Sequence, residues 1–231
     1  MRGPREGRRT HKQLATGLLF CLLAAFTVSP TALPADAWQW KTRDTWQRPQ
    51  KVMDALDLKS GSAVADVGCG DGYFTFRLAE RVGTGGKVYA VDIKASDIEK
   101  IRKKAAKQKL PQIVAVVGDA DDPHLPAGEL EAILVVKAYH EFTAYDAMLG
   151  HFLAALKPGG KFGVIDYIGD PGKPRADYEE HHRIPPELVQ QEVERDKFQL
   201  LRREADFPIP DDSRKMFFLI FERPPQPDSG N

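Results

Sequence analysis

Residues 63–72, with the sequence AVADVGCGDG, decide the fold of this chain. The first five are a short, largely apolar run of the kind that forms a buried strand. Three glycines follow at alternate positions, Gly68, Gly70 and Gly72. Glycine permits a tight turn and lets a ligand approach the backbone closely. A helical pattern begins directly afterwards at Tyr73. The order strand, glycine-rich turn and helix predicts the first unit of an α/β domain, with a ligand at the turn.

The same alternation continues along the chain. Apolar runs predict strands over residues 87–92, 113–117, 132–136 and 162–165, and amphipathic patterns predict helices over residues 44–58, 73–82, 96–109 and 143–156. Ser96 with Glu99 three residues later has the capping-box pattern, so we expect the third of these helices to begin there. Thr143 is expected to cap the fourth.

The last third of the chain has a different pattern. A helix is predicted over residues 186–195, followed by strands over residues 198–202 and 216–221 that are separated by a turn. The earlier strands are continuous apolar runs, which a sheet covered by helices on both faces requires. We therefore predict a doubly wound, mostly parallel seven-stranded sheet with a C-terminal antiparallel hairpin at its edge.

The N-terminal 37 residues have the pattern of a secretory signal peptide. Five basic residues precede an uncharged run over residues 14–28, and Ala35-Asp36-Ala37 offers a small-x-small cleavage pattern. An uncleaved membrane anchor and a buried helix are the alternatives. A cleaved signal predicts an exported protein, periplasmic or secreted, whose folded domain spans residues 38–223 and whose tail, residues 224–231, is disordered.

Composition argues against several function classes. The chain has 231 residues, 33 basic and 33 acidic, so no overall charge favours nucleic acid or an anionic membrane. Two cysteines cannot form a disulfide framework or a multi-cysteine zinc site. Seven basic residues lie between Lys94 and Lys109, but no aromatic side chains that could stack on bases stand among them. A solvated helix face is the simpler interpretation, and we expect a small-molecule partner and no nucleic acid.

Carboxylates stand at or just after the ends of three successive strands, at Asp66, Asp92 and Asp119. At the second of these, a carboxylate can accept hydrogen bonds from both hydroxyls of a ribose. Asp119 can accept a hydrogen bond from an adenine amino group. The pattern therefore indicates an adenosine-type ligand. A nicotinamide dinucleotide is disfavoured, because Tyr73 occupies the position of the third glycine in G-x-G-x-x-G.

Residues 64–72 with Asp92 resemble the first motif, and its acidic partner, of class I S-adenosylmethionine-dependent methyltransferases. Residues 156–161, LKPGGK, resemble the turn before the fifth strand in the ubiquinone/menaquinone-biosynthesis-like branch. Residues 119–125 and 138–142 are similar to stretches in an uncharacterised bacterial group of that branch. The resemblance covers about residues 44–222 and implies a Rossmann-like methyltransferase fold.

The resemblance also implies a cofactor, S-adenosylmethionine, and the residues that would bind it. Its methionine and ribose would lie against Asp66, Gly68, Gly70 and Gly72, its ribose hydroxyls on Asp92, and its adenine near Asp119 and Ala120. Two residues depart from the pattern. Lys137 stands where relatives often have an acidic or small polar residue, and Lys197 where many have a glycine.

Candidate catalytic residues follow the fourth predicted strand. His140 is the first choice as a base or a substrate-orienting group, with Glu141 beside it; the alternative is a structural histidine in the pocket wall. Candidate substrate-binding residues are Tyr139, Asp166 at the end of the fifth strand, and His182 and Arg183 in a segment that could cover the pocket. Arg43, Trp46 and Arg48 could also cover it. No metal site is predicted, because His140, His181 and His182 lack a ligand spacing.

These observations predict methyl transfer from S-adenosylmethionine to a small-molecule acceptor. A protein that binds an adenosyl ligand without catalysis is the alternative, and a nicotinamide-dependent oxidoreductase is a less favoured one.

Overall fold

The computed structural model describes residues 35–207 and 215–225, together with residues 1 and 3. Its described strands form one sheet of seven, in the order β3-β2-β1-β4-β5-β7-β6. Their bounds are β1 Ala63–Val67, β2 Lys87–Asp92, β3 Ile113–Val117, β4 Leu130–Val136, β5 Leu156–Tyr167, β6 Gln199–Phe207 and β7 Met216–Glu222. The first five pair in parallel, and β7 pairs antiparallel with both β5 and β6. The predicted fold class is confirmed.

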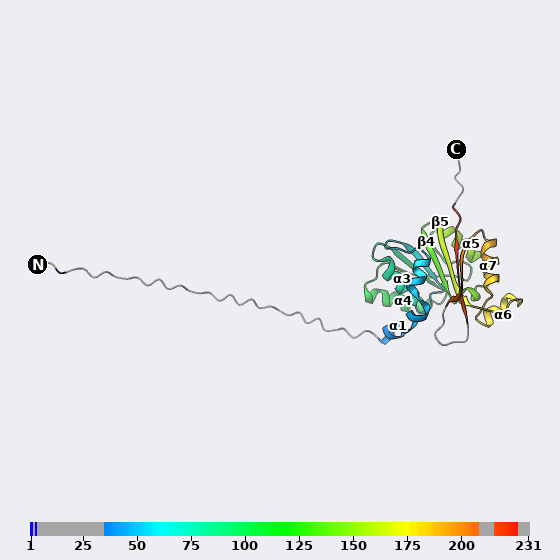
Figure 1. Cartoon of the computed structure of the whole chain (residues 1–231), viewed down its shortest axis with the longest axis horizontal. Helices are drawn as coiled ribbons and strands as arrows, with labels where there is room; N and C mark the ends of the chain where they lie inside the picture. Colours follow the sequence, from blue (N-terminus) through cyan, green and yellow to red (C-terminus); the bar gives the residue numbers. More distant parts are fainter. Residues whose placement is uncertain (2, 4–34, 208–214, 226–231) are drawn as a thin grey trace, which may run out of the picture. The chain divides into compact units, whose positions relative to one another are not determined.

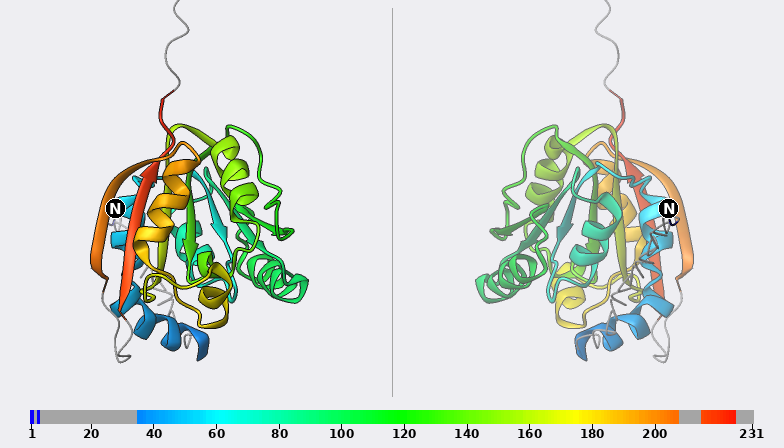
Figure 2. Two further views of the ribbon diagram at one scale, coloured as in Figure 1. Left: turned by 90° about the vertical axis from the view of Figure 1, so that its right-hand side faces the viewer. Right: turned by 90° about the vertical axis from the view of Figure 1, so that its left-hand side faces the viewer.

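Helices cover both faces of the sheet (Figure 1). They are α1 Ala35–Gln47, α2 Pro49–Ala55, α3 Tyr73–Val82, α4 Ala95–Gln108, α5 Tyr145–Ala155, α6 Arg175–Glu180 and α7 Pro186–Arg195, with a 3₁₀ helix, η1, at Tyr139–Glu141. Figure 2 shows the domain from two opposite sides. The short helix α6 and η1 were not predicted.

Alternate strand residues pack against different helices. On one face, Val67, Val135 and Val164 belong to a core cluster with α5 and α7. On the other face, Val64 and Leu134 pack with α2 and α3, and Ala90 with α3 and α4. Because side chains alternate along a strand, strands covered on both sides must be apolar at every position, as the sequence indicated.

Three predicted helix starts or spans are wrong. The helix predicted over residues 44–58 is divided between α1 and α2, because Pro49 disfavours helical backbone at Arg48, which adopts φ 45°. The helix expected to start at Ser96 is capped by Lys94, and that expected to start at Thr143 by Ala144; neither has a side-chain cap. The first of these helices begins at Ala95, one residue before Ser96, and the second begins at Tyr145, two residues after Thr143.

Strand order reverses between β1 and β4, whose neighbours lie on opposite sides. Ligands in open α/β sheets bind beyond the carboxyl ends of the strands at such a point. The turn after β1 and the η1 segment after β4 meet there. The fold therefore places the glycine-rich turn and the candidate residues His140 and Glu141 at the same end of the sheet.

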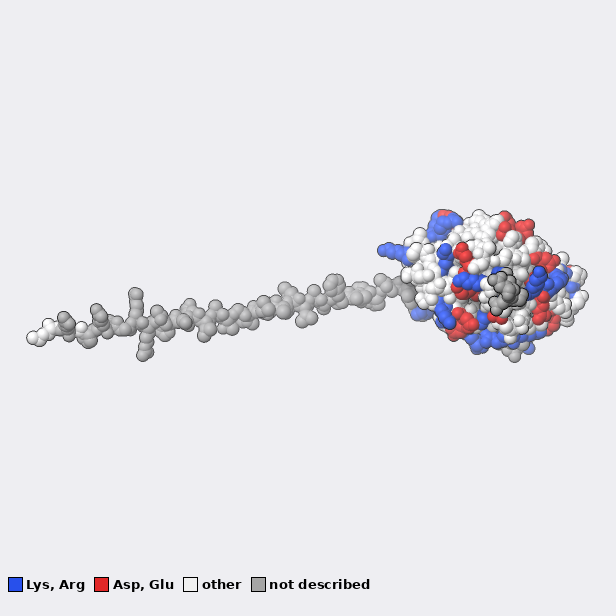
Figure 3. All heavy atoms as spheres, turned by 90° about the horizontal axis from the view of Figure 1, so that it is seen from above, with Lys and Arg blue, Asp and Glu red and all other residues white. Residues whose placement is uncertain are grey.

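The predicted signal peptide lies almost wholly outside the described residues, apart from residues 1, 3 and 35–37, the last three at the start of α1. Most of the predicted tail, residues 226–231, also lies outside them. Within the part of the chain that is described, no helix combines the length and the apolar character needed to cross a membrane. Acidic and basic side chains are interspersed on the face shown in Figure 3.

Candidate cofactor and acceptor site

The glycine-rich turn depends on backbone conformations that favour glycine. Gly68, Gly70 and Gly72 have φ of 70°, 51° and 77°. A Cβ on Gly68 would lie 2.4 Å from the Cβ of Ala138, the residue that caps η1. A Cβ on Gly70 would meet nothing within 4 Å. Gly68 therefore lets β1 and β4 approach each other, whereas Gly70 leaves open space.

Asp92 fixes the turn from the end of β2. Its Oδ2 accepts a hydrogen bond from the Gly70 N–H at 2.9 Å, and its Oδ1 accepts one from the Lys94 N–H at 2.9 Å. The N–H groups of Gly68 and Cys69 both donate to the Val91 carbonyl. Each carboxylate oxygen has a second lone pair, so Asp92 can accept hydrogen bonds from a ligand as well.

A cavity of about 360 Å³ opens beside this turn. Five of the seven predicted cofactor-binding residues line it, and residues from η1 and α6 complete the wall. The lining residues include Gly68, Gly70, Asp92, Asp119, Ala120, Lys137, Glu141 and Glu179. The structure therefore brings the second and third strand ends, the glycine turn and Glu141 around one space.

Asp119 stands at the cavity rim, with its side chain mostly exposed. Its Oδ2 lies 2.9 Å from the His124 Nε2, and its N–H donates to the Asp122 carbonyl at 2.7 Å. These contacts hold the segment after β3 over the cavity. Asp119 and the adjacent Ala120 both line the cavity, and their contact with an adenine stays a prediction.

Asp66 and Gly72 do not line the cavity. Asp66 is buried beneath the turn, where its Oδ2 accepts a hydrogen bond from the Thr75 hydroxyl at 2.6 Å. Burial raises the pKa of Asp66 to about 7, against the lowering effect of the Thr75 hydrogen bond. Gly72 caps α3, and a Cβ there would approach Ile101 and Phe76 to 3.1 Å. Both residues shape the turn from behind and do not face a ligand.

His140 is buried behind the cavity wall, with a side-chain exposure of 3%. Its Nδ1 lies 2.9 Å and 3.0 Å from the two carboxylate oxygens of Asp166, and its backbone N–H donates to Asp166 Oδ2 at 3.2 Å. Burial lowers the pKa of His140, but the hydrogen bonds and charges of Asp166 and Glu141 outweigh it and raise the pKa to about 9. Asp166, which is fully buried, therefore positions His140 and has no exposed atom for the acceptor contact that was predicted.

Glu141 has a side chain that is half exposed and lines the cavity. Its Oε1 lies 3.7 Å from the His140 Nε2 and 3.9 Å from the His182 Nδ1. The hydrogen bond to His140 lowers the pKa of Glu141, so the group is a carboxylate at neutral pH. Of the two predicted catalytic residues, Glu141 is the one that faces the cavity.

His182 and Arg183 come from the segment after α6. The His182 Nδ1 lies 3.3 Å from the His140 Nε2, so His182 joins the His140 and Glu141 pair. Arg183 lines a separate hollow together with His181 and Asp170. Neither His182 nor Arg183 is among the residues that line the cavity, contrary to the prediction; Glu179 of the preceding helix α6 does line it.

Tyr139 does not line the cavity, contrary to the prediction of a substrate contact. It is fully buried, and its hydroxyl donates to Glu192 Oε2 on α7 at 3.0 Å. The guanidinium of Arg175 binds the Tyr139 and His140 carbonyls at 2.9 Å and 2.8 Å. Sequence reasoning missed Arg175 and Glu192, since nothing in the sequence near either residue indicates these contacts.

The two departures from the family pattern have different consequences. Lys137 lines the cavity and adopts φ 55°, and its ammonium lies 5.8 Å from the centre of the Trp46 ring. Lys197, between α7 and β6, adopts φ 69°, which explains why glycine suits that position.

Arg43, Trp46 and Arg48 are not among the residues that line the cavity. Arg43 instead pairs with Asp71 of the glycine turn, its Nη1 lying 2.6 Å from Asp71 Oδ2. Through that pair α1 contacts the turn from outside. Cover of the cavity by these three side chains is not seen.

The chain is similar in sequence to known methyltransferases. Residues 64–160 match a family described as a methyltransferase domain. The chain is 30% identical to nocamycin O-methyltransferase of Saccharothrix syringae over 53% of this chain and 44% of that protein. It is 27% identical to demethylmenaquinone methyltransferase of Lactococcus lactis over 55% of this chain and 50% of that protein. The chain therefore spans about half the length of these curated relatives.

The fold has solved counterparts. A crystal structure of an S-adenosylmethionine-dependent methyltransferase from Aquifex aeolicus superimposes with a TM-score of 0.66 at 22% identity, over 82% of this chain and 99% of that one. At this identity the likeness concerns the fold alone. Residues 64–160 are thus similar to a methyltransferase domain, and the chain has the fold of a solved S-adenosylmethionine-dependent methyltransferase.

Proposed function

We propose that this protein binds S-adenosylmethionine in the cavity beside the glycine turn and transfers its methyl group to a small-molecule acceptor. The observation that carries the proposal is the convergence of Gly70, Asp92 and Asp119 on one cavity at the point where strand order reverses. The relatives named above are methyltransferases, two of them named for small-molecule products or substrates.

The residues present fit an adenosyl cofactor. The cavity of about 360 Å³ falls in the range of small-molecule sites, about 300–1,000 Å³. Asp92 retains acceptor capacity for ribose hydroxyls, and Gly70 leaves space that a Cβ would fill. Asp119 with Ala120 borders the far end of the cavity. When bound, S-adenosylmethionine supplies an electrophilic methyl group on a sulfonium.

The acceptor end of the cavity is assigned to its η1 side. Glu141, Lys137 and Glu179 bring two carboxylates and an ammonium to this wall. Asp166 holds the His140 ring from behind, and the other nitrogen of that ring lies beside the Glu141 carboxylate. Methyl transfer is an in-line displacement, so the contribution of these groups is to hold and orient the acceptor in a partly closed space. The charged wall favours a polar acceptor.

Ligand binding tests the proposal directly. S-adenosylhomocysteine at ~1 mM should raise the melting temperature of the protein by about 5–10 °C if its dissociation constant is about 10 μM, since 100-fold excess adds roughly 2.7 kcal/mol. NAD at the same concentration should not. Asp92→Asn should abolish most of the shift. Asp54→Asn is the matched control, because Asp54 is an exposed carboxylate on α2 that pairs with Arg81.

The outcomes separate the alternatives. A shift with S-adenosylhomocysteine but no methyl transfer to any polar acceptor would favour a non-catalytic binding protein. A shift with NAD alone would favour the oxidoreductase. No shift with either ligand, in folded protein, would exclude the proposed cofactor.

A further inference from the structure

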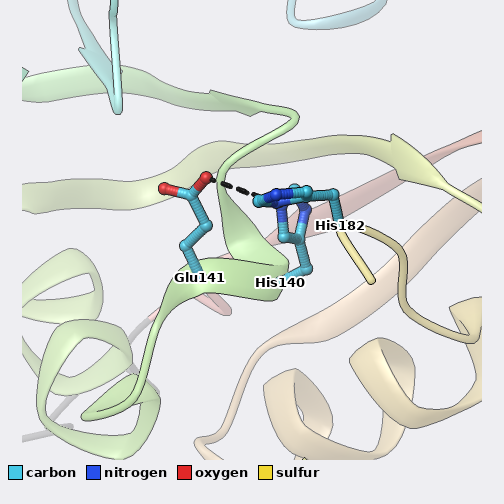
Figure 4. Close-up of side chains that lie close together, drawn as sticks. All are labelled: His140, Glu141 and His182. Carbon is cyan, nitrogen blue, oxygen red and sulfur yellow. Dashed lines mark hydrogen bonds and ion pairs between the residues drawn. The ribbon is translucent and has the colours of Figure 1, made fainter. Parts of the chain in front are cut away.

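His140, Glu141 and His182 bring three metal-binding atoms together beside the cavity (Figure 4). The atoms are His140 Nε2, Glu141 Oε1 and His182 Nδ1, and all lie within 4.8 Å of one another. His140 and Glu141 are neighbours in η1, whereas His182 follows α6. Figure 4 shows the three side chains pointing toward one another from these two segments.

The separations match those around a transition-metal ion. Zinc–nitrogen bonds of about 2.0–2.1 Å at a tetrahedral angle place two nitrogens about 3.4 Å apart. The His140 Nε2 and His182 Nδ1 lie 3.3 Å apart. Glu141 Oε1 is somewhat farther away, 3.7 Å and 3.9 Å from these nitrogens. Its half-exposed side chain can close the remaining few tenths of an ångström by rotation.

Asp166 prepares His140 for this role. Its two carboxylate oxygens, 2.9 Å and 3.0 Å from the His140 Nδ1, accept the proton on that nitrogen. A metal ion on Nε2 replaces the proton of that nitrogen, so the Nε2 lone pair then points toward the ion between His182 and Glu141. A carboxylate that accepts from the outer nitrogen of a histidine is the usual outer partner of a metal-binding imidazole.

His182 is held in place by backbone hydrogen bonds. Its N–H donates to the Glu179 carbonyl at 3.2 Å, and the N–H of Ile184 donates to Tyr167 at the end of β5 at 3.0 Å. The Gly169 N–H donates back to Ile184 at 3.1 Å. The segment that carries His182 is thus paired to the end of β5, one residue beyond Asp166.

We propose that His140, Glu141 and His182 form a binding site for a divalent transition-metal ion, with zinc as the expected occupant. Two imidazoles and one carboxylate favour zinc, manganese or iron(II) over magnesium, which prefers oxygen ligands. The Glu141 carboxylate beside the two imidazoles, with Asp166 behind His140, favours a cation at this cluster.

The site is open to ligands on one side. The side chain of His182 is 66% exposed and that of Glu141 50%, and Glu141 lines the cavity. Three protein ligands leave at least one coordination position for another group. An ion here would bind an acceptor that presents an oxygen atom, at the end of the cavity assigned to the acceptor. The three side chains alone provide the metal ligands, so the proposed metal site does not depend on whether the protein transfers methyl groups.

Zinc binding to tag-free, metal-stripped protein tests the proposal. Isothermal titration should give one zinc site with micromolar or tighter affinity and no comparable site for magnesium. Cobalt(II) should give a visible absorption band that zinc displaces. His182→Ala and Glu141→Gln should each weaken zinc binding at least tenfold. His181→Ala is the matched control, because His181 adjoins His182 but lines a different hollow.

The two variants act at exposed side chains, so the test does not depend on replacing the buried His140. Equal zinc affinity in the native protein, His182→Ala and Glu141→Gln would overturn the proposal, and so would the absence of a zinc site in the native protein. Binding of zinc without binding of S-adenosylhomocysteine would uphold this site and sink the proposed function. The reverse result would uphold the cofactor pocket alone.

Discussion

The Cα of Gly68 and the side chain of Ala138 are so close that a single added carbon would not fit. A Cβ on Gly68 would stand 2.4 Å from the Ala138 Cβ. Gly68 is the first residue of the turn after β1, and Ala138 caps the 3₁₀ helix that carries His140 and Glu141. The glycine turn and the η1 segment, both of which border the cavity, therefore meet at this contact.

Gly68→Ala should destabilise the protein by about 2–5 kcal/mol. The overlap with Ala138 accounts for about 1–3 kcal/mol, and the left-handed φ of 70° adds about 1–2 kcal/mol for a residue with a side chain. Ala138→Gly should restore the part due to the overlap but not the part due to φ. Urea unfolding of both single variants and the double variant measures the coupling, and additive effects would contradict the proposed contact.

Asp66→Asn should change how stability depends on pH. The folded state raises the pKa of Asp66 from its ordinary 3.8 to about 7, so it binds the proton more tightly than the unfolded chain does. Stability from this group is therefore present below about pH 4, falls as pH rises toward 7, and stays low above that. At about 1.4 kcal/mol for each pKa unit, the loss is roughly 4 kcal/mol.

The measurement is the difference in unfolding free energy between Asp66→Asn and the native protein at pH 4, 5.5 and 8. Most other titrations cancel in this difference. It should shift in favour of the variant as pH rises, because Asp66 loses its proton in the native protein whereas asparagine does not ionise. Thr75→Val removes the hydrogen bond that lowers the pKa of Asp66, so it should move the fall toward higher pH. A difference that is constant with pH would show that Asp66 does not titrate in this range.

The sequence predicted the strands, and the residues of the cavity wall near the glycine turn, better than the positions of the residues around His140. Strand ends and glycines are local signals, so Gly68, Gly70, Asp92, Asp119 and Ala120 were placed at one cavity correctly. The direction of a side chain after a strand depends on packing far away in the sequence. Tyr139 lies in the core, where its hydroxyl donates a hydrogen bond to Glu192, 53 residues later in the sequence.

Separation in sequence also explains why the proposed metal-binding cluster was not predicted, because His140 and His182 are 42 residues apart. His181 and His182 are adjacent, and a histidine spacing alone cannot tell which of them meets His140. The pairing of Ile184 with Tyr167 selects His182. The third member of the cluster is Glu141 and not His181, because Glu141 follows His140 in a 3₁₀ turn at the cavity wall.

The N-terminal pattern makes a prediction outside the described part of the fold. If residues 1–37 are a cleaved signal peptide, protein purified from a secretory host should begin at Trp38. Intact-mass spectrometry of the exported fraction measures this. Soluble protein that begins at Met1 in the cytosol would contradict export, and membrane-bound protein that retains residues 1–37 would favour the anchor.

Tyr139→Phe should cost stability without affecting the cofactor pocket. The substitution removes the hydroxyl that donates to Glu192 Oε2, and Glu192 is nearly fully buried. Burial raises the pKa of Glu192, while Arg175 and the Tyr139 hydrogen bond lower it, so the loss of one donor leaves a buried carboxyl with less support. We expect a loss of about 1–3 kcal/mol in the free energy of unfolding.

Tyr89→Phe is the matched control for this prediction. The Tyr89 hydroxyl contacts Glu129 at 3.4 Å, near the limit for a hydrogen bond, in a part-buried position. Its removal should cost less than about 1 kcal/mol. Affinity for S-adenosylhomocysteine should be the same in the native protein and in both variants, because neither tyrosine lines the cavity. A tenfold loss of affinity or of methyl transfer in Tyr139→Phe alone, with stability unchanged, would return Tyr139 to the acceptor contact that the sequence predicted.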